Sequence, residues 1–126
     1  MFEKIKKYIK IFDCLTKVEI AKNKLIATFE CINGGSYETV NFELIFDNPY
    51  IYRMPYFNEG EFEIELIENL NEQDLIEKQY PEGFEKLFVI RNKKKNLVFY
   101  VLCDDIDFKI SGRNYHIKGE KELLID

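Results

Sequence analysis

The amino-acid sequence predicts a mainly β (α+β) fold, an antiparallel β-sandwich or partly open barrel of about eight strands. Apolar and polar residues alternate along several short segments, and turn-forming residues separate those segments. Aromatic residues, which suit half-buried pleated surfaces, make up 15% of the chain. A chain of 126 residues has the commonest size of one domain, so we expect a single domain over residues 1–126.

The chain begins with a segment of helical periodicity. Phe2, Ile5, Ile9 and Phe12 recur three or four residues apart, with lysines between them, which predicts one amphipathic N-terminal helix. Its apolar stripe either caps one end of the core or lies on an anionic membrane surface. We favour the cap, because a single short stripe is little for a membrane-binding helix.

From residue 13 onward the period changes to two. A strand is expected around Leu15–Ala21, and it turns at residues 22–24 into the clearest hairpin of the chain. The tight turn of that hairpin, Asn33-Gly34-Gly35-Ser36, tolerates positive φ angles. The apolar positions of its two strands are Leu25, Ala27, Phe29, Cys31, Val40, Phe42, Leu44 and Phe46.

The middle of the chain is less regular. Residues 47–58 contain two prolines among aromatic residues, and they predict a loop or an edge strand because proline cannot donate to a sheet ladder. Phe62, Ile64 and Leu66 alternate with glutamates and predict a further strand. A polar stretch with Asn71 as its N-cap predicts one short helix near 71–79.

The last third predicts a meander of strands. One strand covers residues 84–91 and a polar turn covers residues 92–96. Leu97–Cys103 is almost wholly apolar, as expected of a strand that is covered on both faces. After two aspartates, alternation resumes from Ile106 to Ile110, and a last strand is expected around residues 115–117.

Composition argues against several classes of protein. The net charge of −5 disfavours direct binding of nucleic acid. Cys14, Cys31 and Cys103 are odd in number and far apart, which indicates reduced, structural cysteines in a cytosolic protein. The N-terminus lacks the features of a signal peptide, and no apolar stretch is long enough to cross a bilayer. We therefore expect a cytoplasmic protein with no membrane partner.

The sequence offers no familiar catalytic or metal-binding motif. His116 is the single histidine and faces solvent if its neighbours face the core, although a pair with Cys103 stays open. Cysteine and histidine are not clustered as zinc requires. Residues 104–107 supply carboxylates but lack the glycine of a calcium loop, so we interpret them as a solvated strand start. We expect no enzyme activity, no cofactor and no metal.

The charge of the chain is unevenly distributed. Between Arg53 and Lys78 there are eight acidic residues and no basic one, while the remainder of the chain has a small positive excess. If the apolar residues of 62–66 face the core, Glu61, Glu63 and Glu65 form a row on the opposite face. Such a row either protects an edge strand from aggregation or attracts a basic protein partner.

An aromatic segment at residues 50–57 precedes the acidic stretch, and tyrosine and arginine are enriched at interface hot spots. The sequence therefore predicts a partner-binding face in this region. Its members are Tyr52, Arg53, Tyr56, Glu59, Glu61, Glu63, Glu65 and Glu68.

The layout of the chain resembles the small immunity proteins of bacterial polymorphic and contact-dependent toxin systems. The similarity lies in the small acidic chain, the Leu25–Phe46 hairpin with its Gly-Gly turn, the Pro/aromatic segment 49–57 and the closing segment 99–106. These features cover most of the chain and assign no role to a single residue. The resemblance implies a protein that binds a toxin domain, often a basic nuclease, and blocks it without chemistry.

Three functional hypotheses follow. The first is a non-catalytic protein that neutralises a basic protein partner, as an immunity protein does. The alternative is an intracellular β-barrel that binds a small apolar ligand in a cavity lined by Phe29, Phe42, Phe99 and Tyr100. The third and least favoured is an enzyme that uses paired carboxylates. Partner identity, strand order and oligomeric state stay open at this point.

Overall fold

The computed structural model describes residues 1–31, 40–54, 58–67 and 86–112. These residues form one helix and nine strands, so the protein is mostly β as predicted. The elements are α1 (Phe2–Ile9), β1 (Cys14–Ala21), β2 (Lys24–Glu30), β3 (Val40–Asp47), β4 (Ile51–Arg53), β5 (Asn58–Glu59), β6 (Phe62–Ile67), β7 (Lys86–Asn92), β8 (Leu97–Cys103) and β9 (Asp105–Gly112).

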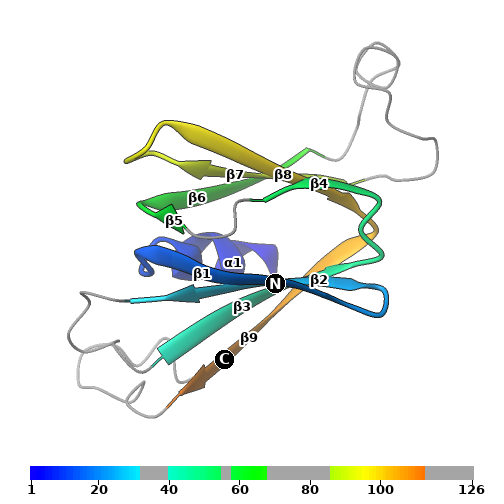
Figure 1. Ribbon diagram of the computed structural model, residues 1–126, viewed down its shortest axis with the longest axis horizontal. Helices are drawn as coiled ribbons and strands as arrows, with labels where there is room; N and C mark the ends of the chain where they lie inside the picture. Colours follow the sequence, from blue (N-terminus) through cyan, green and yellow to red (C-terminus); the bar gives the residue numbers. More distant parts are fainter. Residues whose placement is uncertain (32–39, 55–57, 68–85, 113–126) are drawn as a thin grey trace.

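The strands form two antiparallel sheets that face each other, with α1 between them at one side (Figure 1). Sheet A has the strand order β5-β1-β2-β3-β9, and sheet B has the order β4-β8-β7-β6. The two sheets do not close into a barrel. The predicted antiparallel sandwich with an N-terminal helix is therefore confirmed.

The two sheets are joined at a corner where one ladder of strands bends. β3 pairs with β9 in sheet A, and their continuations β4 and β8 pair in sheet B. At the bend, the Tyr50 N–H donates to the Leu102 carbonyl (2.9 Å) and the Asp104 N–H donates to the Asp47 carbonyl (3.0 Å). Asn48 adopts a positive φ of 51° there, a conformation that asparagine tolerates better than most residues. We call residues 47–50 and 103–105 the corner.

A second bend carries the chain from β5 in sheet A to β6 in sheet B. The Gly60 N–H donates to the Asp13 carbonyl (2.8 Å). Asn92 is almost fully buried beside it, donates its side-chain amide to the Glu59 carbonyl (3.0 Å) and accepts from the Lys95 N–H (3.3 Å). A Cβ atom at position 60 would overlap this amide, so glycine leaves the space in which the Asn92 amide makes its hydrogen bonds.

Strict alternation places the core between the sheets. In β3, Val40, Phe42, Leu44 and Phe46 are completely buried, and the residues between them are only partly covered. The Phe42 ring stacks on Phe12 with centroids 5.3 Å apart, and Phe29 meets Phe62 edge to face at 5.1 Å. Aromatic rings from both sheets therefore fill the interior by contact with one another.

Helix α1 contributes its apolar stripe to this core. Ile5, Tyr8 and Ile9 are buried, and the Tyr8 ring contacts Phe42 and Phe108 of sheet A. The helix also packs against β6 of sheet B. The predicted cap of the core is thus confirmed. No helix in the described part of the chain has the length and apolarity to span a membrane.

Strand β8 differs from its prediction at its start. Leu97 and Val98 are 44% and 47% exposed, whereas Val101, Leu102 and Cys103 are fully buried. The reason is that β4 flanks only residues 100–102 of β8, so the first residues extend beyond it. The turn at 33–36, the short helix near 71–79 and the strand around 115–117 lie outside the described residues.

Candidate functional site

The residues predicted to bind a partner divide between the two edges of sheet B. Tyr52 and Arg53 lie on β4 at one edge, and Glu63 and Glu65 lie on β6 at the other, with β8 and β7 between them. Glu59 belongs to β5 of sheet A, and Glu61 lies between β5 and β6. Tyr56 and Glu68 lie outside the described residues.

Register brings two of these residues onto one face. Arg53 pairs with Tyr100, Tyr100 with Val89, and Val89 with Glu65, and residues that pair across strands share a face. This is the outer face of sheet B, because the next row contains the core residues Val101 and Phe88. Tyr52 belongs to that inner row but lies at its open end, where it is 45% exposed.

Three glutamates of the acidic stretch have basic partners. Glu59 pairs with Lys94 (2.9 Å), Glu63 with Lys93 (3.2 Å) and Glu65 with Arg91 (3.5 Å). The hydrogen bond and positive charge of Lys94 lower the pKa of Glu59, and Glu59 in turn raises the pKa of Lys94. The alternation of Glu61, Glu63 and Glu65 away from the core holds, but the row is a mixed-charge surface rather than a purely acidic one.

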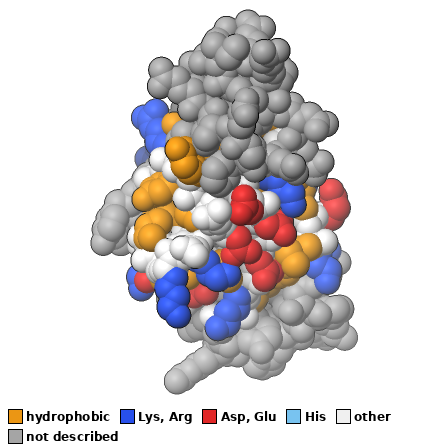
Figure 2. Space-filling view, turned by 90° about the vertical axis from the view of Figure 1, so that its right-hand side faces the viewer, with side chains coloured by type: hydrophobic (Ala, Val, Ile, Leu, Met, Phe, Trp, Pro, Cys, Tyr) orange, Lys and Arg blue, Asp and Glu red, His pale blue; other side chains and the backbone are white. Residues whose placement is uncertain are grey.

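A second group of carboxylates gathers at the corner between the sheets. Register places Asp47 directly opposite Asp105, and Asp104 and Asp107 flank Asp105 along the chain. We call these four residues the corner carboxylates. The face that holds the corner carries a compact group of acidic side chains with lysines around it and apolar side chains beside it (Figure 2).

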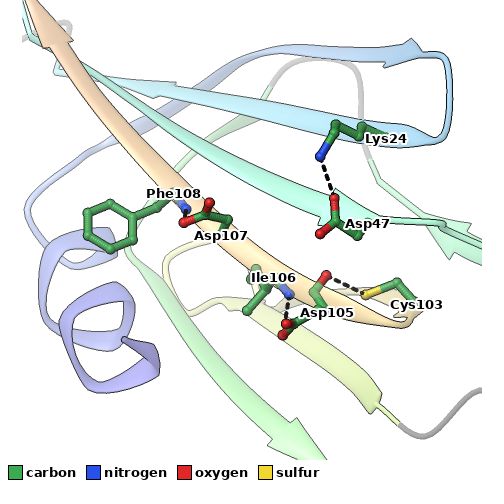
Figure 3. Close-up of polar contacts among 7 residues, drawn as sticks. All are labelled: Lys24, Asp47, Cys103, Asp105, Ile106, Asp107 and Phe108. Atoms are coloured by element: carbon green, nitrogen blue, oxygen red, sulfur yellow. Dashed lines mark hydrogen bonds and ion pairs between the residues drawn. The ribbon is translucent and has the colours of Figure 1, made fainter.

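Backbone and lysine contacts hold the corner carboxylates in place (Figure 3). Lys24 pairs with Asp47 (2.6 Å), and Lys86 pairs with Asp105 (3.1 Å). Asp105 also accepts the N–H of Ile106 (2.9 Å), and this bond, followed by Lys86, lowers the pKa of Asp105.

The other two corner carboxylates have polar but uncharged donors. Asp104 accepts the side-chain amide of Asn48 (3.0 Å), and Asp107 accepts the N–H of Phe108 (2.8 Å). Within the described ranges, no lysine or arginine pairs with either of them. Four carboxylates with two lysines leave the corner with an excess of negative charge.

Two exposed tyrosines extend from the same corner. Tyr50 is 56% exposed and Tyr52 is 45% exposed, and both follow directly on the bend that holds Asp47 and Asn48. Large exposed aromatic side chains next to charged groups are typical of protein interfaces. The tyrosines and the run 104–107 could each be recognised in the sequence, but the corner that unites them with Asp47 depends on the pairing of β3 with β9.

The described residues include few side chains that could act as a nucleophile or bind a metal ion. Cys14, Cys31 and Cys103 are buried free thiols. Burial raises the pKa of Cys103 to about 12, and the charge of Asp104 adds to the rise. The thiolate is the reactive form of cysteine, so burial and the raised pKa both disfavour reaction at Cys103. Among the described residues no three Cys, His, Asp or Glu side chains are arranged to hold a metal ion, and His116 lies outside them.

The hypothesis that the protein binds a small apolar ligand requires a cavity that four aromatic residues line together from one interior surface. Phe29, Phe42 and Phe99 do face the interior, but Phe29 and Phe42 are fully buried in contact with other rings. Tyr100 faces away from them and packs in a second apolar cluster with Leu87, Val89 and Leu102 on the outer face of sheet B. These four residues therefore do not enclose one common cavity.

Comparison with protein-family models, with characterised proteins and with solved structures finds no match for this chain. Its functional assignment therefore depends on the geometry of the corner and of the sheet edges.

Proposed function

We propose that this protein is a non-catalytic binding protein that neutralises a basic protein partner, in the manner of an immunity protein that blocks a bacterial toxin domain. The observation that carries the proposal is the corner, where an excess of carboxylates gathers at the bend from which the exposed Tyr50 and Tyr52 follow in the chain. The carboxylates attract a basic surface and select for it, and the tyrosines supply rigid contact area with a polar end.

The corner carboxylates suit this role better than the glutamates of β6. Glu63 and Glu65 are each engaged by a basic side chain of the protein itself, so a partner would have to displace Lys93 or Arg91. Asp104 and Asp107 accept hydrogen bonds from uncharged donors and form no ion pair with a lysine or arginine in the described part of the chain, so a basic partner would have no such side chain to displace there. We therefore place the centre of the proposed interface at the corner, with Tyr52 and Arg53 in it and the β6 glutamates at its periphery.

A cytoplasmic location belongs to the same proposal. Its support is the set of three buried free thiols, since a reducing compartment keeps thiols in this form. Inhibition by such a protein needs only occlusion of the partner's active site, so it requires no catalytic group of its own.

The proposal is tested with the protein encoded immediately upstream of the gene, as the candidate toxin. Its affinity is measured by calorimetry for the wild type and for Asp104→Asn and Tyr52→Ala. We expect each variant to bind at least about tenfold more weakly, as hot-spot substitutions do. For Asp104→Asn we also expect a weaker dependence of affinity on salt.

The matched control is Glu30→Gln, which removes one carboxylate at the end of β2 opposite to Lys24, the residue of that strand that pairs with Asp47. Its affinity should equal that of the wild type. If the candidate does not bind the wild-type chain, or if Asp104→Asn and Glu30→Gln bind alike, the proposal fails.

A further inference from the structure

A small pocket opens beside the corner, on the side of the sandwich where α1 begins. Its volume is about 250 Å³, and the start of α1, strands β6 and β7 of sheet B and β9 of sheet A surround it. Five of its lining residues are apolar: Met1, Phe2, Leu66, Phe88 and Ile106.

The floor of the pocket is rigid and its walls are partly open. Phe88 is fully buried and Ile106 is 6% exposed, so both belong to the core. Phe2 and Leu66 are half-buried, and the Phe2 ring lies 5.8 Å from the Phe88 ring. An apolar group that enters the pocket would contact core residues without disturbing the sheets.

The rim of the pocket belongs to the corner. The other two lining residues are Lys86 and Asp105, which form the 3.1 Å ion pair, and Asp105 is also a corner carboxylate. Asp105 therefore joins the apolar pocket to the excess of negative charge at the corner. This combination suits an occupant that carries an apolar group next to a positive charge.

We propose that this pocket receives one large apolar side chain, such as Phe, Leu or Met, from the basic partner, while an adjacent Lys or Arg of the partner contacts the corner carboxylates. The inference rests on the proposed function and adds to it the chemistry of the partner's contact segment. The pocket is smaller than the roughly 300–1,000 Å³ of sites for drug-sized ligands, which favours a single side chain. Aromatic and aliphatic anchors in such pockets dominate many protein interfaces.

Capped tripeptides test the inference without knowledge of the partner. Acetyl-Lys-Phe-Lys-amide is titrated into the full chain, and the methyl signals of Leu66 and Ile106 are followed by NMR. We expect these signals to shift with a Kd of about 1–10 mM, as befits a single anchor side chain. Acetyl-Lys-Ala-Lys-amide and acetyl-Glu-Phe-Glu-amide are the comparison probes, and each should bind at least about fivefold more weakly.

Two substitutions examine the site itself. Leu66→Trp fills the pocket and should abolish the methyl shift of Ile106, while Ile20→Trp, at an exposed position on β1, should leave it unchanged. If Leu66→Trp does not fold, Leu66→Phe provides a milder obstruction with the same expected direction.

The outcomes separate this inference from the proposed function. Equal binding of the Phe and Ala peptides would overturn the pocket inference and leave the acidic corner intact. Equal binding of the Lys-Phe-Lys and Glu-Phe-Glu peptides would indicate a site for small apolar molecules, and would overturn the charge requirement. If no peptide shifts the methyl signals, the pocket inference is wrong, and the calorimetric test of the corner decides the proposed function independently.

Discussion

Asn92 illustrates how a single polar residue can fix a bend in the chain. From sequence it belongs to a polar turn at residues 92–96. In the structure it is 1% exposed, and its amide joins the Glu59 carbonyl to the Lys95 N–H. Buried polar groups need such partners, and Gly60 leaves the space in which the amide lies.

We expect Gly60→Ala to lower the free energy of unfolding by about 1–3 kcal/mol, because the added methyl group displaces the Asn92 amide from its hydrogen bonds. Urea denaturation of the purified protein measures this change. The control is the same substitution in an Asn92→Ala background, where the obstacle is absent. A cost of equal size in both backgrounds would show that the Asn92 contact is not its cause.

At the scale of elements, helix α1 shows that an amphipathic pattern specifies burial rather than a partner. Its lysines are exposed, and its apolar stripe is part of the core with Ile5 and Ile9 fully buried. From sequence, the apolar stripe was also compatible with a helix that lies on a membrane surface. In the structure, the protein's own sheets cover this stripe.

We expect Ile9→Ala to destabilise the protein by about 2–5 kcal/mol, as large-to-small substitutions in a packed core do. Thermal or urea unfolding measures the loss. Lys10→Ala, at the exposed residue that follows the helix, should change stability by less than about 0.5 kcal/mol. Similar effects of the two substitutions would contradict the role of α1 as a structural part of the core.

The strands were predictable because one side of each is buried, and burial imposes a period of two on the sequence. Strand β3 follows this rule residue by residue, and β6 follows it from Phe62 to Glu65. Strand β2 departs from it at Thr28, which is buried between Ala27 and Phe29. The basic partners of the β6 glutamates were not predictable in the same way. Their partners Arg91 and Lys93 come 26 and 30 residues later in the chain, and only the pairing of β6 with β7 brings them close.

At the scale of the whole molecule, the candidate site depends on strand order. Asp47 and Asp105 are far apart in sequence and oppose each other because β9 pairs with β3. Local alternation contains no information about which distant strands are neighbours, so the corner carboxylates could not be grouped from sequence. Only Asp104, Asp105 and Asp107 were visible as a local run.

Acid should weaken a connection between the two sheets, because Lys86 of sheet B pairs with Asp105 of sheet A. The pKa of Asp105 is lowered by the Ile106 N–H and then by Lys86, so its carboxylate stabilises the fold above its ordinary pKa of 3.8. That contribution is lost as the pH falls through the lowered pKa.

We expect Asp105→Asn to reduce stability at neutral pH by less than about 1 kcal/mol, since the side chain is 61% exposed and solvent screens the pair. At a pH well below 3.8 the variant and the wild type should be equally stable. Denaturation curves at both pH values make the comparison, with Asp107→Asn as the control that removes no ion pair with lysine among the described residues. A difference in stability between the variant and the wild type that persists in acid would contradict the ionised Asp105 side chain as its cause.

The bent ladder at the corner also bears on how fast the protein folds. Val40 pairs with Gly112 in sheet A and Ile51 pairs with Leu102 in sheet B, so both sheets depend on contacts between distant parts of the chain. Sheet A is incomplete until β9 returns to β3, and sheet B is incomplete until β8 returns to β4. Closing such long loops costs entropy that the later contacts must offset. Proteins dominated by contacts of this kind fold in about milliseconds to seconds. The corner that concentrates charge in the folded protein joins segments that are distant in the chain, so the same long-range pairing that creates the candidate site also slows the folding of the protein.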